Sequence, residues 1–354
     1  MFLKSSWLLG CSTILLLYIV ACPLASAASP RDYLKKTDPW YQSEEGRRIA
    51  RTILSYQAET GSWPKNTDTT QTPYEGNRSS LRGTFDNGAT TDELRFLARS
   101  YVATDDASCK EAFLLGLNHI LEAQYTNGGW PQYYPLSTSY NRHITFNDYA
   151  MVRLMEFLRE VANQPEYEFV DRSLRRKAAE AFDRGIACIL KCQIIVDGRR
   201  TAWCAQHDEI DFRPRPARSY ELVSISGNES VGIVRLLMSL ENPSDEVKRA
   251  IESAVAWFEK VKLTGIREET QDDPLGPGGK NKVVVNNPDA PPIWGRFYQI
   301  GTNRPMFVDR DGVPKYRLDQ IGYERRNGYA WLGNWPGRLL EVDYPAWKHK
   351  YVTD

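Results

Sequence analysis

Carboxylate and amide side chains stand directly before two segments with helical periodicity. The tetrapeptides at residues 84–87 and 145–148 share the form Thr-Phe-Asx-Asx. Their side chains include Asp86, Asn87 and Asp148, which offer the hard oxygen ligands that suit Ca²⁺ and do not suit soft metals. An isolated Asx residue before a helix is more often an N-cap. A calcium site is therefore predicted only if the fold brings the two copies together.

Arginine and aromatic residues supply a second kind of chemistry, the binding of anions. The formal net charge is zero, so the molecule as a whole attracts neither nucleic acid nor an acidic polymer. Between Arg296 and Arg326, however, seven Lys/Arg accompany four Asp/Glu, with aromatic residues interleaved. A long polar stretch at 203–221 contains Arg218 and Tyr220, and long loops of this composition are usually functional. We therefore expect a local basic site in an otherwise neutral protein, and no nucleic-acid partner.

An internal repeat indicates how these residues are positioned. Gln57, Gln124 and Gln193 each end an apolar segment with helical periodicity, and each is followed by a glycine-containing loop that carries tryptophan. The three glutamines stand 67 and 69 residues apart (57, 124, 193). A repeat of this kind is typical of stacked units, because one unit cannot bury its own apolar face.

A second helical segment follows each loop, and together the pairs predict the fold. The patterns run over residues 92–102, 151–161 and 231–240, and the first and third begin with capping-box spacing, Thr90 with Glu93 and Ser226 with Glu229. Strand patterns are scarce, and the Pro/Gly-rich stretch 272–292 indicates a surface excursion. We predict an all-α fold, an incomplete α/α toroid of repeated helix pairs with long functional loops. Equivalent loops of stacked units emerge on one rim, so Asp86, Asp148 and the loop with Arg218 should meet there.

The N-terminus predicts export. An apolar run follows Lys4 and ends at a small-residue A-x-A site, so residues 1–27 are expected to be a signal peptide cleaved near Ala27. The alternative is a lipobox at 19–22 that leaves Cys22 lipidated and anchors the protein to the outer membrane. Residues 28–354 are then one catalytic domain, secreted or periplasmic, monomeric and without a membrane span. Export permits disulfides, but the sequence does not decide pairing among the remaining cysteines, Cys109, Cys188, Cys192 and Cys204.

Six stretches of this chain resemble the family ten polysaccharide lyases, which are pectate lyases. They are NGGWPQYYP (127–135), HITFNDYAM (143–151), WCAQHD (203–208), PARSYELVSISGNES (216–230), RFYQIGTNRPMFVDRDGVPKY (296–316) and GYAWLGNWP (328–336). They occur in order over most of the chain. The fold of that family is an incomplete α/α toroid, in agreement with the repeat.

The resemblance implies roles for particular residues. Asp86, Asn87 and Asp148 would form a calcium site, with Asn87 also at the substrate, and Arg218 would be the Brønsted base. The substrate carboxylates would be held by Arg296 and Arg310, with Tyr220 beside them. Many relatives carry a small polar or acidic residue after the Asn-Asp pair, where this chain has Tyr149. If that position helps to hold calcium, metal affinity is expected to be weaker in this chain.

The resemblance implies calcium-assisted β-elimination of polygalacturonate to 4,5-unsaturated oligogalacturonides. Two alternatives remain open from the residues alone. Asp86 and Asp148 could be the acid and base of an inverting glycoside hydrolase, if their carboxyl groups lie ~6.5–9.5 Å apart. The chain could also be a pectin-binding protein without turnover. Mid-chain or terminal cleavage and tolerance of methyl esters are not determined by the sequence.

Overall fold

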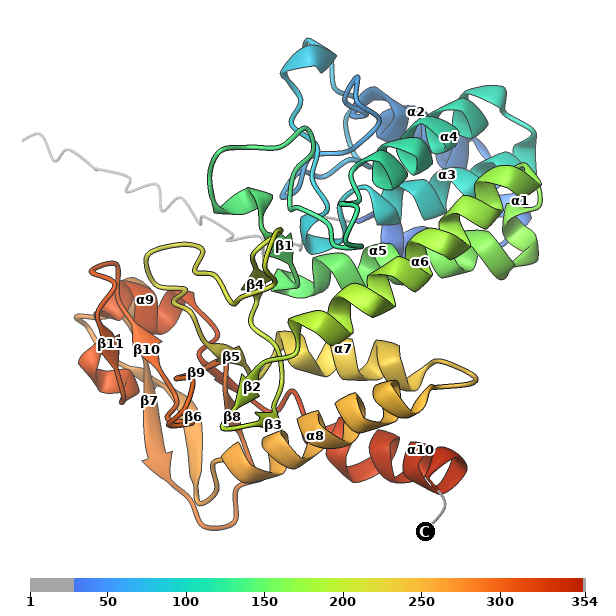
Figure 1. Ribbon diagram of the computed structural model, residues 1–354. Helices are drawn as coiled ribbons and strands as arrows, with labels where there is room; N and C mark the ends of the chain where they lie inside the picture. Colours follow the sequence, from blue (N-terminus) through green and yellow to red (C-terminus); the bar gives the residue numbers. More distant parts are fainter. Residues whose placement is uncertain (1–28, 353–354) are drawn as a thin grey trace, which may run out of the picture.

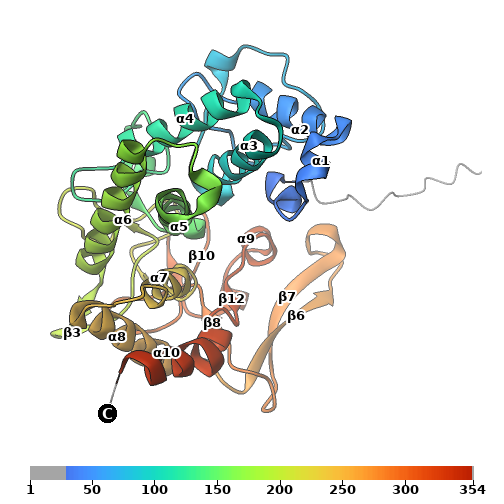
Figure 2. The same cartoon turned by 90° about the vertical axis from the view of Figure 1, so that its right-hand side faces the viewer.

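Two rows of helices form an open arc in the computed structural model, which describes residues 29–352 (Figures 1 and 2). The outer row is α2, α4, α6 and α8, and the inner row is α3, α5 and α7; α1 packs on α2 and α3 at one end, and α10 closes the other. The helices are α1 (Asp38–Gln42), α2 (Glu44–Ser55), α3 (Thr91–Thr104), α4 (Ala107–Glu122), α5 (Ala150–Asn163), α6 (Arg172–Cys192), α7 (Glu229–Met238), α8 (Asp245–Val261), α9 (Tyr323–Gly328) and α10 (Tyr344–Tyr351). The predicted all-α incomplete toroid is confirmed.

Strands are short and pair in twos among the described residues. They are β1 (Ile144–Thr145), β2 (Ile195–Val196), β3 (Arg199–Arg200), β4 (Gln206–His207), β5 (Ile225–Ser226), β6 (Ile266–Asp272), β7 (Lys280–Asn286), β8 (Trp294–Gly295), β9 (Phe297–Tyr298), β10 (Phe307–Val308), β11 (Pro314–Lys315) and β12 (Leu332–Gly333). The long pair β6–β7 is an antiparallel hairpin that projects from the arc beside α9 (Figure 2). The predicted surface excursion is thus a structured hairpin that begins before residue 272.

Tryptophan fixes the end of each outer helix to the loop that follows. The indole Nε1 of Trp63 donates to the carbonyl of Ile53 at 2.8 Å, and those of Trp130 and Trp203 donate to the carbonyls of Ile120 and Ile189. Carbonyls in the last turn of a helix lack an intrahelical partner, so the indole supplies one. The chain contains a fourth such contact, from Trp294 to Phe258 in α8. The sequence pattern missed this unit, because the β6–β7 insertion separates its helix from its tryptophan.

The three repeated glutamines tie each unit to the next. Gln57 Nε2 donates to the carbonyl of Gly61 in its own loop and to that of Ala112 in the next outer helix. Gln124 and Gln193 make the corresponding pairs of hydrogen bonds. Each amide therefore satisfies two backbone carbonyls at the interface between adjacent units, which explains why the residue type recurs.

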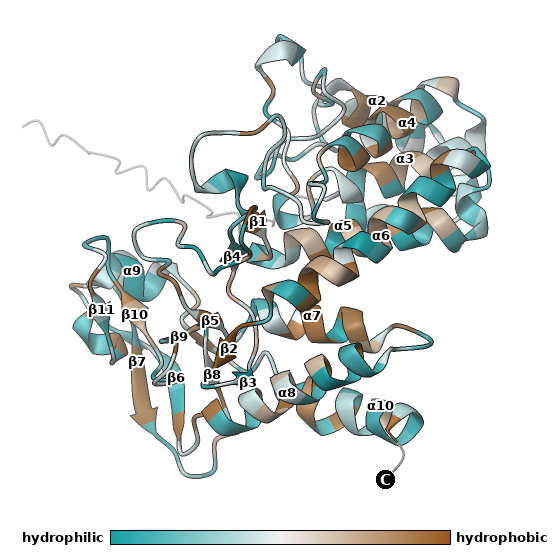
Figure 3. Cartoon of the chain, viewed as in Figure 1, coloured by the Kyte–Doolittle hydropathy of each residue, from teal (hydrophilic) through white to brown (hydrophobic). Residues whose placement is uncertain are grey.

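Apolar faces of the helices meet between the two rows, and polar residues cover the outside (Figure 3). The capping box at Thr90 and Glu93 is confirmed. At α7 the prediction is only partly right: the N-cap is Asn228, while the Ser226 hydroxyl still accepts from the Glu229 N–H at 3.0 Å.

The structure describes the four remaining cysteines but not the predicted N-terminal leader. Cys109, Cys188, Cys192 and Cys204 are buried free thiols. The predicted leader at residues 1–27 and the lipidation at Cys22 lie outside the described residues. Within residues 29–352, no helix combines the length and apolar character that crossing a membrane requires.

Candidate functional site

Backbone hydrogen bonds between consecutive units bring their loops onto one rim. The Phe85 N–H donates to the carbonyl of Gln132 in the second unit. The N–H groups of Phe146 and Asn147 donate to Ala205 in the third, next to the β1–β4 pairing. The N–H of Gly227 donates to Arg296 in the fourth unit, beside the β5–β9 pairing. The two Thr-Phe-Asx-Asx segments consequently contact one another, as the repeat predicted.

Both of these segments have the same unusual backbone. The segment 86–88 forms a single 3₁₀ turn with Asn87 at φ 56°, and the segment 147–149 forms another with Asp148 at φ 49°. Asx residues tolerate this left-handed conformation better than other side chains. The tetrapeptide therefore encodes a backbone shape that turns its carboxylate and amide groups away from the usual N-cap position. The N-caps of α3 and α5 are instead Thr90 and Tyr149.

Asp86 is almost fully buried, and only one of its two carboxylate oxygens has a hydrogen-bond partner. Its Oδ2 accepts from Gln132 Nε2 at 2.7 Å and pairs with the ammonium group of Lys65. Its Oδ1 is buried and has no hydrogen-bond partner among the described residues. Burial alone would lower the pKa of Lys65, but the Asp86 carboxylate holds it above its usual value. An unpartnered buried carboxylate oxygen is costly, so this atom is suited to a cation.

Asp148 is half-buried and pairs with a buried ion pair, Arg296 with Glu229. Arg296 Nη2 donates to Asp148 Oδ1 at 2.9 Å and to Glu229 Oε1 at 2.5 Å. The Glu229 side chain is 0% exposed and that of Arg296 is 8% exposed. Arg296, predicted to bind a substrate carboxylate, is therefore engaged on one edge by two carboxylates of the protein. Its Nε lacks a partner among the described residues.

Arg218 is held by Glu221. The Nε of Arg218 donates to Glu221 Oε2 at 2.7 Å, its Nη2 donates to Oε1 at 2.5 Å, and the hydroxyl of Tyr329 also donates to Oε1 at 2.8 Å. Burial alone would raise the pKa of Glu221, but the bond to Arg218 holds it below its usual value. The same bond raises the pKa of Arg218. The charge nearest to the Arg218 guanidinium is therefore an anion, which favours the charged form of this side chain.

Tyr220 gathers three guanidinium groups. Its buried ring lies 4.9 Å from the guanidinium carbon of Arg218, 5.8 Å from that of Arg310 and 4.5 Å from that of Arg325. The structure thus brings together three of the residues predicted at the substrate. Arg310 is exposed and donates to Glu324 at 2.9 Å. Much of the basic segment 296–326 is similarly paired internally, which leaves fewer free cations than its sequence suggests.

Several residues of the site carry no motif of their own. Lys65 and Gln132 occupy the same place in two repeats, directly after Trp63-Pro64 and Trp130-Pro131, and both contact Asp86. Aligning the repeats would have found them. Glu229 and Tyr329 lie inside the quoted motifs, but their partners Arg296 and Glu221 are distant in sequence.

A separate group, His143, Asp208 and Glu209, has the composition of a metal site. The carboxylates of Asp208 and Glu209 already have hydrogen-bond and ion-pair partners in the protein. Asp208 accepts from Arg215 and from two backbone N–H groups, and Glu209 pairs with Arg142 and His143. This group therefore braces the loop 208–215.

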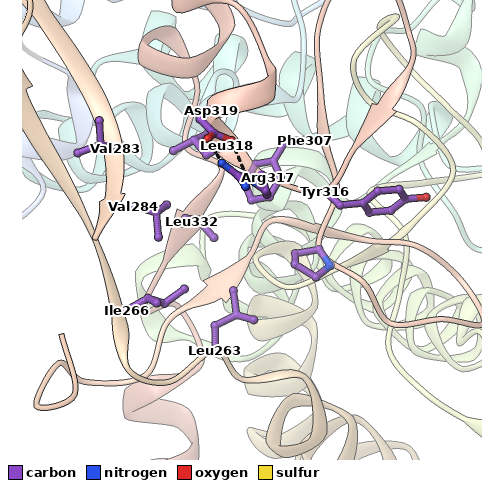
Figure 4. A pocket seen from close by; sticks show the side chains of 11 residues that line it. Leu263, Ile266, Val283, Val284, Phe307, Tyr316, Arg317, Leu318, Asp319 and Leu332 are labelled. Atoms are coloured by element: carbon purple, nitrogen blue, oxygen red, sulfur yellow. Dashed lines mark hydrogen bonds and ion pairs between the residues drawn. The ribbon is translucent and has the colours of Figure 1, made fainter. Parts of the chain in front are cut away.

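A hollow of about 520 Å³ lies between the hairpin and the C-terminal segments (Figure 4). Leucine, isoleucine, valine and phenylalanine side chains line most of it, with the Arg317–Asp319 ion pair at one side. It contains none of the predicted site residues, so the candidate chemistry lies on the rim described above.

Comparisons with known proteins agree with this arrangement. Residues 57–340 match the family model described as pectic acid lyase. A family 10 polysaccharide lyase from Cellvibrio cellulosa is 35% identical in sequence, with a TM-score of 0.77 over 89% of this chain and 95% of that chain. An aspartate-to-alanine mutant of a family 10 lyase from the same organism, in complex with trigalacturonic acid, is 34% identical, with a TM-score of 0.77 over 91% of this chain and 96% of that chain. A search of curated proteins found no match.

An open helical toroid with carboxylates and arginines on one rim, together with these matches, defines an enzyme of the lyase class that acts on polysaccharides. The family match covers most of the chain. The chain belongs to the pectic acid lyase family, and its solved relatives are family 10 polysaccharide lyases.

Proposed function

We propose that this lyase cleaves polygalacturonate by β-elimination with Ca²⁺ bound at Asp86, Asn87 and Asp148. The observation that carries the proposal is the buried Asp86 Oδ1 without a partner, on the rim where it meets the segment of Asp148. Asp86, Asn87 and Asp148 all offer oxygen ligands of the kind that Ca²⁺ prefers. Asn147 Oδ1 is a second buried oxygen without a partner in the described chain. Calcium bound there would neutralise a uronate carboxylate and so make its C5 proton more acidic.

The arginines would position the anionic chain. Arg310 and Arg218 share the Tyr220 ring, and Arg296 lies 4.9 Å from the ring of Tyr329, which also binds Glu221. Guanidinium groups match carboxylates geometrically and remain charged. The trigalacturonic acid in the related mutant supports this substrate class.

Arg218 is the residue we assign to proton abstraction. In the reaction its guanidine takes the C5 proton, the C4–O bond breaks, a C4–C5 double bond forms, and the leaving oxygen takes a proton from solvent. Glu221 favours the charged guanidinium, so Arg218 must loosen from Glu221 to become neutral. Its side chain is 42% exposed, which leaves room for that movement. The same proposal includes export of the protein and action as a monomer.

The test is ultraviolet absorbance of the unsaturated product on polygalacturonate, for the wild type and Arg218→Ala, with and without EDTA. The expected result is a rise that needs Ca²⁺ and disappears in the variant, while the variant still binds polygalacturonate. New reducing ends without absorbance would instead indicate hydrolysis and direct attention to Asp86 and Asp148. Binding with neither signal would indicate a pectin-binding protein.

A further inference from the structure

Lys65 occupies one oxygen of the proposed calcium ligand. Its ammonium group pairs with Asp86 Oδ2, to which Gln132 also donates, while Asp86 Oδ1 remains without a partner. The Asp86 side chain is 3% exposed and that of Lys65 is 28% exposed. The carboxylate is thus fixed in the protein, and its cationic partner reaches it from the solvent side on a flexible stem. The two partners of this ion pair differ greatly in their freedom to move.

We propose that Lys65 is an internal competitor of Ca²⁺ for Asp86 and that calcium binding transfers the Lys65 ammonium to a substrate carboxylate. This inference rests on the proposed function. A divalent ion on Oδ1 and an ammonium on Oδ2 of one carboxylate would repel each other strongly in a site with little water. Lys65 can relieve the repulsion by rotating away, whereas Asp86 cannot, because it is buried and held by Gln132.

The surroundings of Lys65 indicate where the released ammonium goes. Lys65 lines a cavity of about 280 Å³ together with Asn87, the residue that we place at both the calcium ion and the substrate. An anionic sugar bound at Asn87 would therefore present its carboxylate on the same side as Lys65. The sugar carboxylate would pair with the Lys65 ammonium once this ammonium has left Asp86. Substrate and calcium would then each favour binding of the other.

The competition predicts a measurable change in calcium affinity. Substituting Lys65→Met removes the competing charge and leaves the Gln132 hydrogen bond to Asp86 in place. We expect Ca²⁺, titrated alone and followed by calorimetry, to bind Lys65→Met about tenfold more tightly than wild type, which corresponds to about 1.4 kcal/mol. Lys65→Gln should behave similarly while keeping a donor for Asp86, and Lys65→Arg should resemble wild type. Lys177→Met, the same chemical change at an exposed position of α6, is the matched control and should change nothing.

The transfer of Lys65 to substrate is tested by repeating the titration with trigalacturonate, in an Arg218→Ala background that prevents turnover. Trigalacturonate should tighten calcium binding when Lys65 is present, and tighten it clearly less when Lys65 is methionine or glutamine. Thermal unfolding checks that each variant is folded. Calcium affinity that is unchanged or weaker in both Lys65→Met and Lys65→Gln would overturn the inference while leaving the calcium site intact. A folded wild type that binds no Ca²⁺ with or without trigalacturonate would overturn the calcium part of the proposed function as well.

Discussion

Removing Arg296 should destabilise the protein more than any change at an exposed arginine. In Arg296→Met, Glu229 keeps its contacts with Ser226 and Asn228 but loses the cation that balances its charge. Glu229 is 0% exposed, so its carboxylate cannot turn to solvent. Breaking a buried pair by removing one partner costs about 3–5 kcal/mol. The remaining hydrogen bonds of Glu229 place the expected loss near the lower end of that range, at about 3 kcal/mol.

The assay is reversible denaturant unfolding, supported by calorimetry. A loss of about 3 kcal/mol should lower the melting temperature by roughly 4 °C in a domain of this size. The matched control is Arg310→Met, because Arg310 is exposed and its pair with Glu324 lies in solvent. That variant should change the stability far less than Arg296→Met does, because solvent screens an exposed ion pair.

A double variant separates the lost charge balance from lost packing. Glu229→Gln in the Arg296→Met background removes the uncompensated charge, so it should restore at least half of the lost stability. The reasoning would be refuted if Arg296→Met cost no more than Arg310→Met. It would also be refuted if the two substitutions at 296 and 229 simply added, because then the two side chains would not be energetically coupled.

Three further outcomes are expected from the same structure. Gln193→Leu should cost about 2–3 kcal/mol in denaturant unfolding, because two buried carbonyls lose their donor, while exposed Gln271→Leu should cost almost nothing; equal costs would contradict the bridging role. His207 Nδ1–H donates to the Phe212 carbonyl and its Nε2 accepts from the Cys204 N–H, and burial lowers its pKa to about 4. Because the unfolded state binds the proton more readily, the stability of the wild type should fall as pH drops from about 6.5 to 4. The stability difference between wild type and His207→Gln, measured by unfolding at a series of pH values, should shrink over that range. Glu221→Gln removes the main cause that raises the pKa of Arg218, so the pH optimum of the lyase should move down by about one unit; an optimum that does not move would argue against Arg218 as the base.

The scaffold was largely predictable from sequence because its determinants are local. Glutamine at the end of an outer helix and tryptophan in the next loop act within about a dozen residues of one another. Their spacing is the same in the first two units and four residues longer in the third. The fourth unit was missed because 32 residues, including the β6–β7 hairpin, lie between Val261 and Trp294. Only the tertiary contact from Trp294 to Phe258 reveals the unit.

The site was only partly predictable because charge pairing is non-local. Asp86 and Asp148 stand out by motif, but the Arg296–Glu229 pair spans 67 residues and the Tyr329–Glu221 bond spans 108. Residue type alone could not show that Arg218 would be paired with an anion, although Glu221 is only three positions away. Which of several nearby acids and bases pair is decided by burial, and burial is a property of the assembled units.

The tryptophan contacts also indicate how this fold can tolerate insertions during evolution. Because each indole secures the point at which the chain returns to its helix, the residues between helix and tryptophan can vary in number without moving the rim. The fourth unit illustrates this tolerance: a whole β6–β7 hairpin is accommodated before Trp294 reaches Phe258. The loops of the rim can therefore keep their positions while the insertions between helix and tryptophan change in length. Such insertions would allow related proteins to bind different polymers with the same residues on the rim.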